Sequence, residues 1–234
     1  MKPKILIGIP TCDWYDYCLM EFIGSIRALD YDNTEILFVD NSKGDNYAKK
    51  LNSLGFKAKQ IPYYEKPRDK MVHSRNLLRS EFLKGEYDYM LLLDADVIVP
   101  PNSLSKLLTH NKKVITGIYY SFYKINGQTR MMPVLWMQED EKKQLMKFFT
   151  PEEVEGSKLV EARACGTGCL LIHKSVLEQI QFRYKPEVDA CDDVWFCHDI
   201  KQKGIQLYAD TSIKCKHKII HRIQNKDEWK SRKK

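Results

Sequence analysis

The sequence contains no long apolar run. No stretch reaches the roughly 18 consecutive apolar residues that a membrane-spanning helix requires. Residues 1–10 hold a short apolar run but no small-residue cleavage site, so we predict a first β-strand here and no signal peptide. Internal repeats and low-complexity segments are also missing, which argues against a solenoid or a disordered protein. The 234 residues suffice for one large domain with a proper core.

Cysteine motifs are lacking as well, although the chain has 7 cysteines. This number is odd, no C-x-x-C pair occurs, and the spacings do not match zinc fingers or ribbons. Several of these cysteines lie in apolar surroundings. We therefore expect reduced, mostly buried thiols in a cytoplasmic protein.

Positive charge is in excess, with a formal net charge of +7, and it is densest at the C-terminal end. We predict that residues 221–234 form a basic tail outside the folded domain. A solvated tail is the simpler interpretation, and peripheral contact with anionic lipid at the inner membrane face is the alternative. No nucleic-acid recognition motif accompanies the charge, so nucleic acid is not an expected partner.

Strand-like and helix-like segments alternate through the first 120 residues. This alternation predicts an α/β domain over residues 1–220, with a mostly parallel central sheet, helices on both faces and a small antiparallel part. Residues 121–158 break the rhythm, and we expect an insertion or flap there. The expected strands cover residues 4–9, 34–39, 57–63, 90–93, 113–120, 159–172, 205–209 and 212–217, and the expected helices 15–29, 45–54, 71–84, 103–110, 174–180 and 192–203.

The stretch Tyr87–Pro101, YDYMLLLDADVIVPP, carries the strongest functional signal. Met90 to Leu93 form an apolar run typical of a strand buried on both faces. Asp94 and Asp96 follow directly, and the carboxyl ends of such strands are where open α/β sheets bind their ligands. Two carboxylates one residue apart also suit a hard divalent cation that keeps positions for water and phosphate oxygens.

Other candidate groups follow other predicted elements. Asp40 ends the second strand, as Asp94 ends its own strand. Asp192 and Asp193 open a helix, where the helix dipole alone would favour acids, so simple capping is an alternative to a chemical role. His217 ends the last strand, and a lone histidine is more often structural than a metal ligand.

The order of short motifs along the chain resembles the family 2-like glycosyltransferases of the GT-A fold. The motifs are IGIPT, FVDNS, HSRN, LLLDADV, GTGCLLI, DDVWFCHDIKQKG and a late histidine, and together they run from Lys4 to His217. The resemblance implies transfer of a sugar from a nucleotide-sugar donor, of UDP or GDP type, to an acceptor hydroxyl. UDP is the expected donor class. The acceptor is open: a glycan, a lipid phosphate, a protein or a small molecule.

The resemblance also implies roles for individual residues in donor binding. Pro10 and Thr11 would lie against the nucleotide base, and Asp40 would accept a hydrogen bond from it. Arg75 would approach the nucleotide or its diphosphate. The small-residue segment from Gly166 to Gly168 would allow donor and acceptor to come close, and Ala95 would belong to the same donor-binding site. Residues 121–158, the least typical part, would be the acceptor side.

The remaining implied roles concern the metal and the proton. Asp96, with His217 as a further ligand, would hold a Mn²⁺ or Mg²⁺ ion that bridges the two phosphates. Asp94 would contact the ribose of the donor, or the metal through water. Asp193 matches the catalytic base of the family's Glu-Asp pair, and Asp192 stands where glutamate is commoner, so either acid could act. We expect an inverting transfer, in which a carboxylate takes the acceptor's proton during in-line attack, with Asp193 as that base. A retaining transfer, in which Asp193 would only position the acceptor, stays open on sequence alone.

Two alternatives remain open on sequence alone. A sugar-nucleotide pyrophosphorylase would also use an α/β sheet and acidic metal ligands, but it usually has a glycine-rich loop after the first strand. Here Pro10-Thr11-Cys12-Asp13 stands at that place. A basic binding module that kept the fold and lost the chemistry is the second alternative, and the joint presence of the acids and His217 argues against it.

Overall fold

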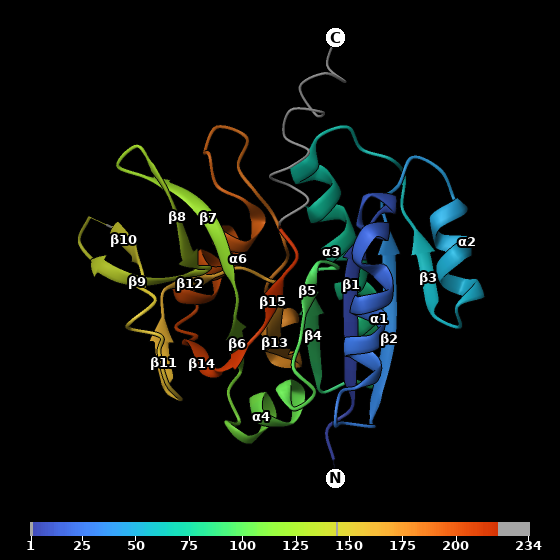
Figure 1. Ribbon diagram of the computed structural model, residues 1–234, viewed down its shortest axis with the longest axis horizontal. Coiled ribbons are helices and arrows are strands. Elements are labelled where there is room, and N and C mark those ends of the chain that lie inside the picture. The colour runs from blue at the N-terminus through green and yellow to red at the C-terminus, as the bar shows by residue number, and fades with distance from the viewer. Residues whose placement is uncertain (1, 144, 220–234) are drawn as a thin grey trace.

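A central sheet of eight strands organises the protein (Figure 1). The computed structural model describes residues 2–143 and 145–219. The strands lie in the order β11-β14-β6-β13-β4-β1-β2-β3; β13 is antiparallel to β4 and β6, β11 is antiparallel to β14, and the other pairs are parallel. The expected mostly parallel sheet is thus confirmed. The bounds are β1 Ile5–Thr11, β2 Thr34–Asp40, β3 Lys57–Gln60, β4 Tyr89–Leu93, β6 Val114–Ile118, β11 Leu159–Ala162, β13 Cys169–His173 and β14 Leu207–Lys214.

The sheet is buried on both faces because its central strands are almost entirely apolar. Alternate residues point to opposite faces, so Leu92 joins one apolar cluster, whereas Leu91 and Leu93 join the other. Helices α3, α5 and α6 pack in the cluster of Leu92, and α1, α2 and α4 in that of Leu91. The bounds are α1 Leu19–Arg27, α2 Asn46–Ser53, α3 Pro67–Lys84, α4 Ser103–Thr109, α5 Lys174–Leu177 and α6 Asp192–Gln202.

Several element boundaries differ from the sequence prediction. The helix expected from residue 71 begins at Pro67, because proline's fixed φ suits a first helical position even without apolar periodicity. The helix expected over 15–29 is a 3-10 turn, Asp13–Cys18, followed by α1. The two strands expected over 205–217 are one strand, β14, and the short β15, Lys216–His217.

Residues 121–143 and 145–148 form mainly antiparallel strands, and turns and irregular chain follow over 149–158. Strands β7 (Tyr120–Ile125) and β8 (Gln128–Pro133) make a hairpin whose turn, Asn126-Gly127, has the positive φ angles, 51° and 78°, that a tight hairpin turn needs. Strands β9 (Leu135–Asp140), β10 (Leu145–Phe148) and β12 (Ala164–Cys165) form a three-stranded sheet. In Figure 1 this hairpin and sheet lie on the left, opposite α2 and β3.

Two further predictions concern the C-terminal tail and membrane-spanning helices. The basic tail predicted over 221–234 lies outside the described residues. Within the described part, no helix combines the length and the apolar character needed to cross a bilayer.

Candidate active site

A cavity of about 670 Å³ opens at the carboxyl ends of β1 and β4, where the sequence predicted the ligand site. Three elements supply its charged walls: the first turns of α3, the end of β4 and the first turn of α6. Its lining includes Pro10, Trp14, Arg68, Lys70, Arg75, Asp94, Cys191, Asp192 and Asp193. Acids and cations therefore face one space that is large enough for a small-molecule substrate.

Arg75 is the electrostatic centre of this cavity. Its side chain is only 5% exposed, and its Nη1 donates to Asp192 Oδ2 at 2.6 Å, whereas Nη2 donates to Asp94 Oδ1 at 3.2 Å. Burial alone would lower the pKa of Arg75, but the carboxylates of Asp192 and Asp94 raise it above its ordinary value. Arg75 thus stays charged and neutralises Asp192, whose side chain is 3% exposed.

Asp193 lies beside this pair but is not held by it. Its side chain is half-buried, and its Oδ1 accepts a hydrogen bond from the Val194 backbone N–H at 2.7 Å. Burial, together with the charge of Asp192, raises the pKa of Asp193 to about 6 against the opposing effect of Arg75. A carboxylate with a pKa near neutrality can accept a proton during a reaction and release it afterwards.

Asp96 and His217 lie close together just beyond the carboxyl end of β4. The pairing of β5 (Val97–Ile98) with β15 places His217 opposite Val97, and its Nε2 lies 3.5 Å from Asp96 Oδ2. His217 Nδ1 lies 2.9 Å from the Tyr120 carbonyl oxygen, which can only accept, so we assign the proton to Nδ1. Nε2 then faces the Asp96 carboxylate and is the ring nitrogen that would bind a metal ion.

This arrangement fits two of the predicted metal ligands. Two lone-pair donors that face one another suit a shared divalent cation, and a carbonyl that holds the far ring nitrogen is a common support for a histidine ligand. Asp94 is instead paired with Arg75. Among residues 2–143 and 145–219, no three His, Cys, Asp or Glu side chains gather as a ligand group. A bound ion would need oxygens from phosphate or water as well.

The other predicted donor-binding residues fall into two groups. Pro10 lines the cavity. Thr11, Asp40 and Ala95 are buried, and Asp40 Oδ1 accepts from both the backbone N–H and the hydroxyl of Ser42. Asp40 therefore organises the loop after β2 in this structure, and its contact with a base stays a prediction.

Gly166 and Gly168 have a clear packing reason. A Cβ at Gly166 would lie 2.0 Å from the Tyr119 hydroxyl oxygen, and one at Gly168 would lie 2.8 Å from the Tyr119 ring. The Gly168 N–H donates to that hydroxyl at 3.2 Å, and the ring packs edge-on against His217 with centroids 5.2 Å apart. The glycines thus let a buried tyrosine support the histidine, and their predicted role in substrate approach is not tested by this contact.

Sequence reasoning missed Arg68, Lys70 and Trp14 in the cavity and Tyr119 beneath it. Arg68 and Arg75 are seven residues apart and so share a helix face, and this spacing could have identified Arg68 as a cavity residue. The predicted helix over 71–84 leaves Arg68 outside, so the spacing was not recognised. Arg68 now donates to the Val188 carbonyl at 3.0 Å and pairs with Asp189.

Comparison with known proteins places these features in a family context. The sequence profile described as Glycosyl transferase family 2 matches residues 7–181 of the 234. No curated protein matches the sequence.

Three solved structures share the fold over 92% of this chain. GalNAc-T7, crystallised with UDP, GalNAc and Mn²⁺, has a TM-score of 0.67 at 16% identity, and 44% of its chain is covered. S. aureus TarS, in complex with UDP-GlcNAc, has a TM-score of 0.59 at 14% identity, with 59% covered. A197 from STIV has a TM-score of 0.50 at 18% identity, with 85% covered. The chain thus spans about half the length of the first and somewhat more of the second.

Proposed function

The chain belongs to glycosyltransferase family 2 and has the GT-A fold, and from this premise we propose that it transfers a sugar from a UDP-sugar to an acceptor hydroxyl with inversion. We assign Asp193 as the base and place a Mn²⁺ or Mg²⁺ ion at Asp96 and His217. The UDP of two similar structures and the Mn²⁺ of one support the donor and the metal.

The contrast between Asp192 and Asp193 carries this proposal. The two acids are adjacent in the first turn of α6, yet one is held by Arg75 at 2.6 Å and the other has a pKa of about 6. Asp192 is thus engaged by a fixed cation, whereas Asp193 can take up and release a proton near neutral pH. The choice that the sequence left open therefore falls on Asp193.

The reaction then follows from the groups in the cavity. Asp193 takes the proton of the acceptor hydroxyl as that oxygen forms a bond to the anomeric carbon, and the bond from this carbon to the diphosphate breaks on the opposite side. Arg68 and Lys70, which line the cavity, can lie against the diphosphate and oppose its growing negative charge. A bound divalent ion would supply further stabilisation of that charge.

Donor and acceptor would enter from different sides of Asp193. Pro10 and Trp14 offer apolar surface for the nucleotide base. Residues 121–158 supply the acceptor side, where Tyr123, Trp136 and Phe148 cluster with ring centroids 4.6 to 6.0 Å apart. The acceptor itself stays open among a glycan, a lipid phosphate, a protein and a small molecule, and a cytoplasmic location with tail-mediated contact at the membrane is the matching proposal for where it works.

Thermal unfolding with UDP or GDP, each with Mn²⁺ or a chelator, tests the donor and metal assignments. A ligand at a hundredfold its Kd adds about 2.7 kcal/mol, which shifts the midpoint clearly. We expect a shift with UDP that needs Mn²⁺. A shift with neither nucleotide would refute the donor site, and a shift that persists in chelator would refute the metal.

A transfer assay on Asp193→Asn tests the base. We expect turnover to fall by about 10²–10⁴-fold, the usual contribution of general base catalysis. Asp199→Asn is the matched control, since Asp199 lies on the same helix and pairs with Arg183 outside the cavity. Equal turnover in both variants would remove Asp193 from the mechanism.

A further inference from the structure

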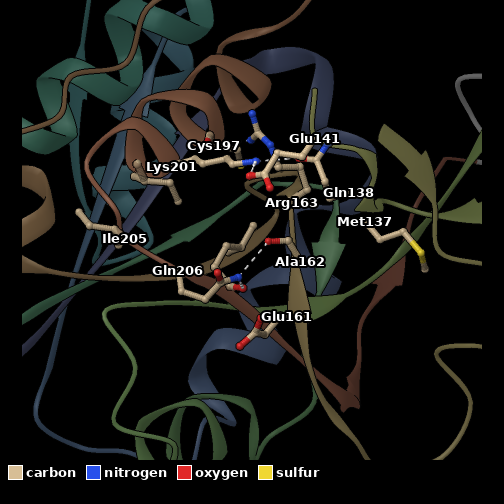
Figure 2. Close-up of a pocket in the computed structure, with 12 residues that line it drawn as sticks. Met137, Gln138, Glu141, Glu161, Ala162, Arg163, Cys197, Lys201, Ile205 and Gln206 are labelled. Atoms are coloured by element: carbon tan, nitrogen blue, oxygen red, sulfur yellow. Dashed lines mark hydrogen bonds and ion pairs between the residues drawn. The ribbon is translucent and has the colours of Figure 1, made fainter. Parts of the chain in front are cut away.

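A second cavity, of about 420 Å³, lies at the far end of α6 from Asp193 (Figure 2). Its walls come from β9, β11, the last two turns of α6 and the start of β14. It shares no lining residue with the candidate active site. Its volume is within the range of small-molecule sites.

Arg163 supplies a positive charge to this cavity, and few polar groups of the described chain contact it. Within the described part of the chain, its guanidinium has one hydrogen bond, from Nη1 to the Cys197 carbonyl at 3.3 Å, and no ion pair. Its Nε is buried without an acceptor. Burial lowers the pKa of Arg163, but an arginine stays charged in proteins. Among residues 2–143 and 145–219, this cation has no counter-ion.

Lys201 adds a second cation. Its Nζ donates to Gln138 Oε1 at 2.8 Å and pairs with Glu141 Oε1 at 3.2 Å, as the dashed lines in Figure 2 show. The Glu141 side chain is 76% exposed, and an exposed ion pair of this kind is weak. An anion that enters the cavity can therefore take the place of Glu141 beside Lys201.

The rest of the lining restricts the ligand's shape and polarity. Met137, Ile200, Ile205 and Leu207 supply apolar surface. Glu161, an exposed acid, also lines the cavity. The two cations and the apolar wall together fit a molecule with an anionic head and a compact apolar body. We propose that this cavity binds a small organic carboxylate or phosphate, with its oxyanion between Arg163 and Lys201 and its body against the apolar wall.

The test uses methyl NMR on the full chain, because each cavity has a methionine reporter. Met137 lines the second cavity, and Met71 lines the active-site cavity. The probes are inorganic phosphate, isobutyrate and acetate at constant ionic strength. We expect saturable shifts of the Met137 methyl with phosphate or isobutyrate, and weaker binding of acetate, which lacks the apolar body.

Phosphate that saturates at lower concentration than isobutyrate would name a phosphate ligand, and the reverse order a carboxylate. Shifts confined to Met71, or none that saturate, would overturn the proposal.

Substitution of single arginines distinguishes binding in this cavity from non-specific attraction of anions to a basic protein. Arg163→Gln should weaken the Met137 response by at least about tenfold, the effect of losing one charge-assisted contact. Arg183→Gln, which removes the same charge outside the cavity, should leave the response unchanged. Lys201→Gln serves if Arg163→Gln does not fold, because the Lys201 side chain is 31% exposed. Unchanged affinity in the folded cavity variant would overturn the assignment.

Discussion

Asp193→Asn should raise the stability of the protein while it removes the activity. The pKa of Asp193 is raised from 3.8 to about 6 by burial, so the folded protein holds this proton more tightly than the unfolded chain does. The folded state is therefore favoured below pH 4, and it loses stability as the pH rises from about 4 to about 6. At about 1.4 kcal/mol for each pH unit of difference, the loss is about 3 kcal/mol at neutral pH.

Asparagine has nearly the same shape and no charge, so the variant avoids this loss. Urea unfolding of both proteins between pH 4 and 7.5 measures it. The stability difference should be near zero at pH 4 and grow to as much as about 3 kcal/mol in favour of the variant above pH 6.5. A difference that does not change with pH would refute the reasoning.

The neighbouring acid provides the matched contrast. Asp192→Asn leaves Arg75 without the carboxylate that lies 2.6 Å from it, and Arg75 is 5% exposed. Removing one partner of a buried ion pair costs about 3–5 kcal/mol. The same substitution at adjacent residues should thus have opposite effects on unfolding at pH 7.5, and equal signs would contradict the division of roles between them.

Three further outcomes follow from the same geometry. Arg75→Met should cost about 3–5 kcal/mol in urea unfolding, and Arg75→Met with Asp192→Leu should recover most of it, because the fully buried charge of Asp192 is then removed as well and the Asp94 carboxylate is 25% exposed. His217→Ala should abolish the Mn²⁺-dependent part of the UDP-induced midpoint shift and leave any metal-independent part; a full shift would remove His217 from the metal site. Gly166→Ala should be strongly destabilised by its contact with the Tyr119 hydroxyl, 2.0 Å from the new Cβ, and Tyr119→Phe should relieve part of that loss in a double-mutant cycle.

The sheet was predictable because its information is local. Met90 to Leu93 form an apolar run that predicts a buried strand. Asp94 and Asp96 follow it directly, so the sequence alone places them at the carboxyl end of that strand. Hydrophobic periodicity and strand order suffice for such positions. The position of Asp192 and Asp193 at the start of α6 was predictable as well, because acidic residues are favoured in the first turn of a helix.

What sequence could not supply was the choice of partners across the fold. Asp94 pairs with Arg75 and Asp96 meets His217, although the two acids are separated by one residue. The second contact depends on a two-residue pairing of β5 with β15, which has no periodic signal. The environment that raises the pKa of Asp193 is likewise tertiary, since it comes from burial in the assembled cavity.

The position of β13 has a consequence for synthesis of the chain. This strand lies between β4 and β6, yet it follows both in sequence, and Leu171 pairs with Leu91 and with Ile115. Until the ribosome has made the residues from Cys169 onwards, the edges of the apolar strands β4 and β6 lack the partner strand that pairs with both of them. Such unpaired edges are prone to join other chains. The nascent protein is therefore most exposed to aggregation in the interval between translation of β6 and translation of β13, and this interval includes all of β7 to β10.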